Sequence, residues 1–282
     1  MIISASRRTD IPMLYSEWFA NRLKAGCVRA VNPMNHKHSE VIELSSAAVD
    51  CIVFWTKDPS GMTDKLDLID KAGIGYYFLF TVTSYDKRIE PGIRDKNEII
   101  KVFCRLSDRL GKERVVWRYD PILLDDCIDA EFHYRQFESI CGMLQEHTDR
   151  CIISFADIYR KTKHAAIREM TENEHIEISG NILRIAMKYG IPLYACSEKV
   201  DLSHMGIKKS SCIDREKIET ICGRKIMEEK DRNQRKECES LKSRDIGAYD
   251  TCIGGCVYCY ANRDATVSAR YHAGHDAEKE NL

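Results

Sequence analysis

The sequence predicts an α/β fold in which a parallel sheet is covered by helices. Three observations favour it. Short apolar runs alternate with segments of helical periodicity as far as Cys196. The runs carry apolar residues on both faces, as buried parallel strands do. Most of them end directly in polar or charged residues, as strands do at the functional edge of such folds. Right-handed crossovers then give a partial or full (β/α) barrel, or an open doubly wound sheet.

The first elements lie before residue 33. Ile2–Ala5 is a short apolar strand, and it ends in a polar loop that contains Pro12. Tyr15–Ala25 has apolar residues at helical spacing, and Gly26 is expected to close the helix. Arg29–Asn32 is expected to form a short strand that stops at a proline.

The next elements repeat the alternation. Cys51–Thr56 is a continuous apolar strand, and Met62–Ala72 reads as a helix that ends at a glycine. Tyr76–Val82 is a second wholly apolar strand. Asn97–Leu110 is the helix that follows, and Gly111 suits its C-terminal cap because glycine readily adopts the left-handed conformation.

The alternation then runs on to Cys196. Arg114–Pro121 is expected to be a strand, Glu131–Glu146 a helix and Cys151–Phe155 a strand. Glu174–Tyr189 is a helix closed by a glycine, and Ile191–Cys196 is the strand after it. No glycine-rich phosphate-binding fingerprint follows any of these strands, which disfavours a dinucleotide-binding fold.

The composition and charge of the chain argue against several classes of protein. The 282 residues are 44% hydrophobic and carry a net charge of −1, so no global basic field favours nucleic acid. There is no signal-peptide pattern and no apolar run long enough to span a membrane. Thirteen cysteines without a secretion signal indicate the reducing cytoplasm, where they bind metals, take part in catalysis or are simply buried.

The most informative stretch lies close to the C-terminus. Cys252, Cys256 and Cys259 have the spacing C-x3-C-x2-C, with two glycines in the first gap and Tyr258 before the last cysteine. Thiolates at such spacing hold iron–sulfur clusters or zinc, because one short loop can then surround the ion or cluster. A [4Fe–4S] cluster bound by three thiolates keeps one iron free for a small molecule.

This stretch resembles the C-x3-C-x-(aromatic)-C signature of the radical S-adenosylmethionine (SAM) superfamily. The resemblance implies that the free iron binds the amino and carboxylate groups of SAM. One electron from the cluster then cleaves SAM to methionine and a 5′-deoxyadenosyl radical, and flavodoxin or ferredoxin supplies electrons. Tyr258 would lie near the adenine. The signature usually follows the first strand of the barrel, whereas here it follows Asp245–Asp250 and precedes a helix at Ala261–Arg270.

The late position of the signature indicates a circularly permuted barrel, with the last strand beside Ile2–Ala5. The expected organisation has four parts. These are a main α/β barrel portion (1–198), an irregular cysteine-containing insertion (199–244), a cluster-binding βα unit (245–270) and a flexible tail (271–282).

Three further stretches resemble strand ends of spore photoproduct lyase-like enzymes: Phe54–Lys57, Phe80–Ser84 and Arg118–Ile122. The resemblance assigns four residues to SAM, namely Lys57, Thr83, Ser84 and Arg118. Cations suit the methionine carboxylate and hydroxyls suit the ribose. An alternative for Arg118 is a structural ion pair with Asp120 at the barrel mouth.

Nearly the full chain also resembles a family known only as a domain of unknown function, on Ser4–Pro12, Val53–Lys57 and the segment from Asp245 to Asn262. In this comparison Asp10 would meet the SAM ammonium group, and Arg7 and Arg8 the carboxylate or the substrate. A solvated charged loop is the alternative for the arginines. Catalytic candidates, as hydrogen donors or radical quenchers, are Tyr119, Cys196 and Tyr258.

Cys196, Cys212 and Cys238 lie in or beside the irregular segment and are candidates for a second iron–sulfur cluster or a zinc ion. In the similar family another cysteine often stands where this chain has Ser240, so a four-thiolate set is incomplete. The lyase resemblance suggests a nucleic-acid lesion as the substrate, and a small metabolite or a peptide is the alternative. A non-enzymatic zinc- or iron–sulfur-binding regulatory protein is the alternative, with His272 and His275 as further ligands.

Overall fold

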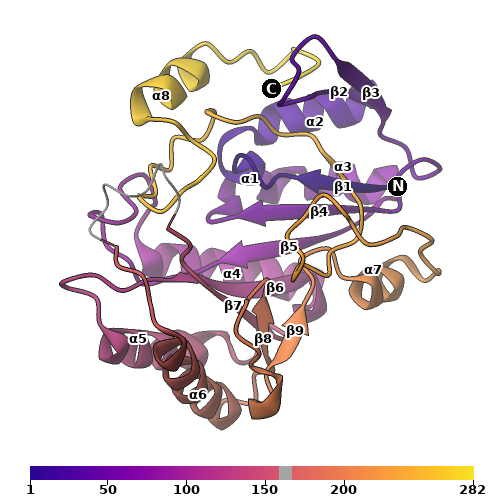
Figure 1. Ribbon diagram of the computed structural model, residues 1–282. Helices are drawn as coiled ribbons and strands as arrows, with labels where there is room; N and C mark the ends of the chain where they lie inside the picture. The colour runs from indigo at the N-terminus through magenta and orange to yellow at the C-terminus, as the bar shows by residue number, and fades with distance from the viewer. Residues whose placement is uncertain (159–166) are drawn as a thin grey trace.

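The computed structural model describes residues 1–158 and 167–282 (Figure 1). Within these residues the centre is a parallel sheet of eight strands in the order β10-β1-β4-β5-β6-β7-β8-β9. In chain order the strands are β1 (Ile2–Ala5), β4 (Cys51–Thr56), β5 (Gly75–Thr81), β6 (Val115–Ile122), β7 (Cys151–Phe155), β8 (Leu193–Cys196), β9 (Lys208–Ser210) and β10 (Arg244–Asp245). The α/β class and the parallel sheet are therefore confirmed.

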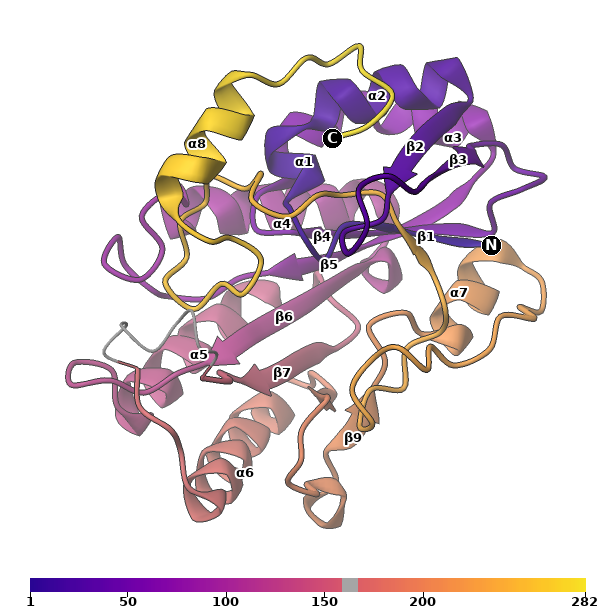
Figure 2. The ribbon, with the colours of Figure 1, turned by 45° about the horizontal axis from the view of Figure 1, so that its top comes forward.

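The connections between the strands are mostly helical, and Figure 2 shows α2 to α6 along one side of the sheet. The helices are α1 (Ile11–Leu14), α2 (Ser16–Ala25), α3 (Leu66–Ala72), α4 (Lys96–Leu110), α5 (Ala130–Leu144), α6 (Glu172–Lys188), α7 (Arg215–Cys222) and α8 (Ala265–Ala273). Side chains of Asp95, Asp129 and Thr171 accept backbone N–H bonds at the first turns of α4, α5 and α6. Such caps fix where each helix begins.

The two faces of the sheet have different partners. The helix-covered face carries the large core, which includes Phe54, Phe78 and Trp117 packed against α2 to α6. The opposite face carries a smaller cluster that includes Val53 and Leu79, and side chains from residues 212–241 cover it. Successive strand residues alternate between the faces, because side chains of a strand point to opposite sides.

The sheet is open, so the full-barrel alternative is wrong for the described residues. Its edge strands are β9 and β10, and neither pairs with the other. Both are short, with three and two residues, and they leave few backbone groups with which to close a barrel. The last strand was predicted to lie beside Ile2–Ala5, and it does. β10 pairs in parallel with β1, at Ile3–Arg244 and Ser4–Asp245.

Several local predictions were wrong. The strand expected at Arg29–Asn32 belongs instead to an antiparallel hairpin, β2 (Cys27–Val31) with β3 (Ser39–Glu43), outside the main sheet. The segment 199–244, expected to be irregular, contains β9 and α7. The start of the helix expected at Met62 is a 3-10 turn, Pro59–Lys65. Two further 3-10 turns are Lys112–Arg114 and Ser203–Met205.

The C-terminal residues lie against the first helix pair (Figure 1). Trp18 Nε1 donates to the Lys279 carbonyl at 2.9 Å, and Arg22 donates to the Glu278 carbonyl at 2.9 Å. In the described part of the chain, no helix is both long enough and apolar enough to cross a lipid bilayer. The four predicted domain boundaries stay a prediction.

Candidate functional site

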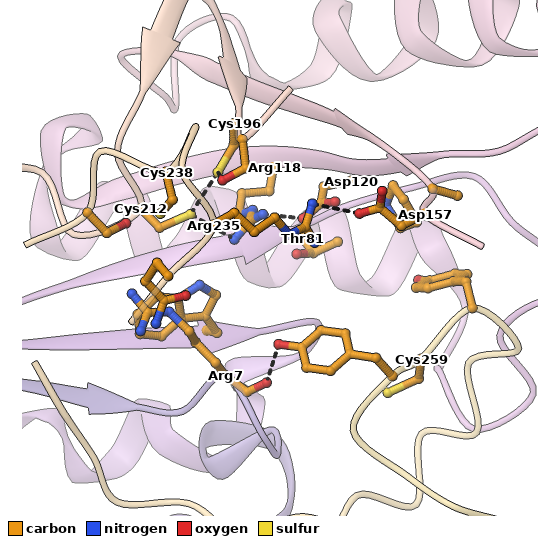
Figure 3. Close-up of a pocket in the computed structure, with 18 of the residues that line it drawn as sticks. Arg7, Thr81, Arg118, Asp120, Asp157, Cys196, Cys212, Arg235, Cys238 and Cys259 are labelled. Atoms are coloured by element: carbon orange, nitrogen blue, oxygen red, sulfur yellow. Dashed lines mark hydrogen bonds and ion pairs between the residues drawn. The ribbon is translucent and has the colours of Figure 1, made fainter. Parts of the chain in front are cut away.

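A cavity of about 340 Å³ lies at the carboxyl ends of the strands (Figure 3). Its walls come from four sources: the strand ends, the loop after β8, the segment 234–240 and the cysteine loop. The strand-end residues include Ser6, Trp55, Thr81 and Arg118. Parallel strands present their carboxyl ends at one edge, which is why residues distant in the chain meet here.

The cysteine loop is seated on the segment that follows β5. Val257 N donates to the Ile89 carbonyl at 3.0 Å, and Gly92 N donates to the Gly254 carbonyl at 3.0 Å. A Cβ at Gly92 would lie 2.6 Å from the Ile253 carbonyl oxygen, closer than real contacts allow. The backbones therefore approach at a point where only glycine fits.

The three cysteines of the loop line the same cavity. Cys252, Cys256 and Cys259 line a smaller cavity of about 160 Å³ together with Asp10 and Lys57. Burial raises the pKa of the Cys252 thiol to about 12 and that of Cys256 to about 11. On the other side, the loop and the start of α8 enclose about 350 Å³.

Two of the sulfur atoms already accept backbone N–H bonds. Gly254 N donates to Cys252 Sγ at 3.4 Å, and Ala261 N donates to Cys259 Sγ at 3.3 Å. Such bonds favour a negatively charged sulfur. Within residues 1–158 and 167–282, no three His, Cys, Asp or Glu side chains are arranged as they would be around a metal ion.

Glu90 is a buried carboxylate that bonds four side chains of the site, and it was not predicted from the sequence. Its carboxylate accepts from Lys57 Nζ at 2.9 Å and from Thr83 Oγ1 at 3.0 Å, and also from Lys96 and the Tyr258 hydroxyl. Burial alone would raise the pKa of Glu90, but the charges of Lys57 and Lys96 lower it to about 2. Glu90 stands in a loop without strand or helix periodicity, so no sequence pattern marked it.

The residues expected to bind SAM separate into two groups. Lys57 and Tyr258 line the main cavity, and the Lys57 ammonium lies 5.6 Å from the centre of the Tyr258 ring. Thr83 is buried and directed at Glu90, and neither Thr83 nor Ser84 lines the two cavities. The hydroxyl that β5 gives to the cavity is that of Thr81.

Asp10 and Arg7 occupy the end of β1. Asp10 accepts from Met13 N at 3.0 Å and from Lys57 N at 2.7 Å, so it joins α1 to the end of β4. Burial raises the pKa of Asp10 to about 7. The Arg7 guanidinium lies 5.1 Å from the centre of the Trp55 ring and lines the main cavity.

Arg118 forms the ion pair with Asp120 that the sequence suggested as the structural alternative. Burial alone would lower the pKa of Arg118, but Asp120 raises it. Its second contact was unforeseen: Nη1 donates to Cys212 Sγ at 3.4 Å. Arg118 therefore joins a carboxylate and a thiol in the wall opposite the cysteine loop (Figure 3).

Of the remaining cysteines, Cys196, Cys212 and Cys238 all line the main cavity, as does Ser240. Cys196 Sγ and Cys212 Sγ lie 3.3 Å apart. The hydrogen bond with Cys196, together with the charges of Arg118 and Arg7, lowers the pKa of Cys212. The fold therefore brings two of the three predicted auxiliary thiols into direct contact.

Tyr119 points away from both cavities. Its hydroxyl lies 2.9 Å from His133 Nδ1, and its ring packs against Phe137 in the helix-covered core. His272 and His275 pack edge-on against Tyr15, whose hydroxyl donates to the Thr251 carbonyl at 2.5 Å. This places both histidines behind the cysteine loop, outside the residues lining the main cavity.

The comparisons with known proteins are sparse. The model of a family described as a domain of unknown function (DUF1848) matches residues 2–261. No curated protein matches the sequence. One solved structure that it resembles, described as an alpha-L-fucosidase from Bacteroides thetaiotaomicron, has 12% identity and a TM-score of 0.25, over 80% of this chain and 82% of that chain.

Proposed function

This chain belongs to the DUF1848 family, and we propose that it is a radical SAM enzyme, which cleaves SAM reductively to start hydrogen abstraction from a substrate. The observation that carries the proposal is the position of the three-cysteine loop. Its three cysteines line one cavity with Lys57 and Asp10, at the carboxyl edge of a parallel sheet. Because β10 leads to this loop and lies beside β1, the proposal includes a circularly permuted partial barrel.

The donor set suits a [4Fe–4S] cluster. Three thiols come from one short loop, and two of them already accept N–H bonds that stabilise thiolate charge. When bound by Cys252, Cys256 and Cys259, the cluster supplies an electron and an iron with an open position. The protein then provides binding, orientation and electrostatics, as it does for other cofactors.

The chain's own residues suit the parts of SAM. The Lys57 ammonium, which lies beside the cysteine loop, would bind the methionine carboxylate. Asp10 would accept from the amino group, the Tyr258 ring would pack on the adenine, and Thr81 would meet the ribose. Trp55 and Arg7 line the cavity and stack on each other, and they would limit the access of water.

The substrate would occupy the opposite half of the cavity, between Arg118, Cys212 and Arg235. The two guanidinium groups of this wall are paired with Asp120 and Asp157. A substrate that carries a carboxylate or phosphate would bind here by replacing one of these carboxylates, because planar N–H groups bind such anions in pairs. Flavodoxin or ferredoxin is the proposed electron donor.

The test is made on anaerobically reconstituted, reduced protein. We expect an electron paramagnetic resonance (EPR) signal of a reduced [4Fe–4S] cluster that changes on addition of SAM, and formation of 5′-deoxyadenosine. Cys256→Ala should lose both, whereas Cys127→Ser, at an exposed cysteine outside both cavities, should keep both. Purified protein that holds a single zinc ion and does not respond to SAM would instead support the regulatory alternative.

A further inference from the structure

The main cavity contains a thiol pair to which the proposed function gives no chemical role. Cys196 is the last residue of β8, and it pairs in register with Ser210, the last residue of β9. Cys212 follows two residues later. The two sulfur atoms lie 3.3 Å apart, and both side chains line the cavity (Figure 3).

We propose that Cys196 and Cys212 are a redox-active dithiol that reduces a low-molecular-weight disulfide entering the cavity and closes to an intramolecular disulfide. Three observations carry the proposal: the contact between the sulfurs, the cation beside one of them, and the cavity that gives access to both. The sulfur contact and the cation do not involve the three-cysteine loop, and the exchange needs no cluster, so the proposal does not rest on the proposed function.

The spacing of the sulfurs suits a disulfide. Two thiolates on one tetrahedral zinc ion, each about 2.3 Å from the metal, lie about 3.8 Å apart. Cys196 Sγ and Cys212 Sγ are closer, at 3.3 Å. A disulfide bond of about 2.05 Å needs a further approach of little more than an ångström, which small side-chain rotations supply.

Arg118 distinguishes the roles of the two thiols. Its Nη1 donates to Cys212 Sγ at 3.4 Å, whereas Cys196 has the Ser197 hydroxyl beside it at 4.0 Å. A guanidinium stabilises negative charge on the sulfur that it contacts, and the thiolate is the attacking form. Cys212 is therefore the attacking thiol, and Cys196 is the resolving thiol.

The exchange balances in two steps. The Cys212 thiolate attacks one sulfur of the disulfide RSSR, forms a mixed disulfide Cys212–S–S–R and releases RS⁻. Cys196 loses its proton and attacks the Cys212 sulfur, which closes the protein disulfide and releases the second RS⁻. Two electrons pass from the dithiol to RSSR, and each RS⁻ takes up one proton to give RSH.

The experiment uses the full chain, reduced and then exposed to oxidised glutathione without oxygen. Remaining thiols are alkylated, and the digest is analysed by mass spectrometry. We expect a peptide that joins Cys196 to Cys212, and loss of alkylation at both. Cys196→Ser should stop the reaction at Cys212 bound to glutathione, and Cys212→Ser should leave Cys196 reduced.

Two controls keep the result specific. Cys141→Ala removes a buried thiol that does not line the cavity, and it should leave the cross-link unchanged. A variant with alanine at Cys252, Cys256 and Cys259 should also form the cross-link, so a failure of the radical proposal would not affect this one. The dithiol proposal is overturned if both thiols alkylate equally with and without oxidised glutathione. It is also overturned if they alkylate only after a bound metal ion has been chelated.

Discussion

Replacing Glu90 by glutamine removes one negative charge from the interior while nearly keeping the shape of the side chain. Glu90 is 1% exposed, and it bonds Lys57, Lys96, Thr83 and Tyr258. Glutamine can still accept hydrogen bonds, but it leaves the two lysine charges without their shared counter-charge. The change therefore tests whether this carboxylate holds the end of β4, the segment after β5 and the cysteine loop together.

The loss of stability in Glu90→Gln can be estimated in two ways. Breaking a buried ion pair by removing one partner costs about 3–5 kcal/mol. Independently, Lys57 and Lys96 lower the pKa of Glu90 from 4.5 to about 2 against the effect of burial. At about 1.4 kcal/mol for each tenfold change in proton affinity, this fall corresponds to roughly 3 kcal/mol. We expect Glu90→Gln to lower the free energy of unfolding by roughly 3 kcal/mol at pH 7.

Urea unfolding at pH 7, followed by circular dichroism, measures the change. The matched control is Glu98→Gln, which breaks an exposed pair with Lys101 at 2.8 Å and should cost less than about 1 kcal/mol. Because the folded-state pKa of Glu90 is depressed, its stabilisation is complete above about pH 4.5 and is lost as the pH falls towards 2. Equal losses in the two variants at pH 7 would refute the reasoning.

Gly92→Ala should lower the iron content of reconstituted protein, measured per chain, because the new Cβ would meet the Ile253 carbonyl at 2.6 Å. Gly142→Ala is the control: its Cβ would meet the nearest atom at 3.6 Å within a helix, and normal iron binding with a small gain in stability is expected. For His133, burial lowers the pKa from 6.5 to about 4, so folding excludes a proton. The free energy of unfolding should therefore fall by roughly 3 kcal/mol between pH 6.5 and 4 through this group. His133→Gln should make the urea midpoint less dependent on pH over that range.

The strands of the large sheet could be predicted where their apolar runs were long. Cys51–Thr56 and Cys151–Phe155 are strands with the predicted bounds, because their side chains are mostly apolar and buried on both faces. β9 is Lys208–Ser210, a charged edge strand of three residues, and composition gives no sign of it. Its pairing with β8 is decided by tertiary contacts that only the fold supplies.

In the site, too, local sequence signals were enough for some residues and not for others. The strand ends led to Lys57 and Arg118, and the cysteine spacing led to the loop, since both are local signals. Glu90 and the contact between Cys196 and Cys212 depend on segments that meet across the fold, at sequence separations of 33 for Lys57–Glu90 and 16 for the thiols. No pattern within one segment encodes such contacts.

One further signal was present in the sequence and would have added Thr81 to the residues expected to line the cavity. Side chains alternate along a strand, so the residues that follow the inner face of β5 are Tyr77, Leu79 and Thr81. The same step of two joins Val53 to Trp55 on β4 and Val116 to Arg118 on β6, and Trp55, Thr81 and Arg118 all line the cavity. Thr83 lies beyond the end of β5 at Thr81, where the chain has left the sheet and alternation no longer sets the direction of a side chain. Apolar runs show where a strand is, and the period of two shows which face a residue follows. Whether Thr83 still belongs to the strand is decided by the end of β5, which the structure places at Thr81.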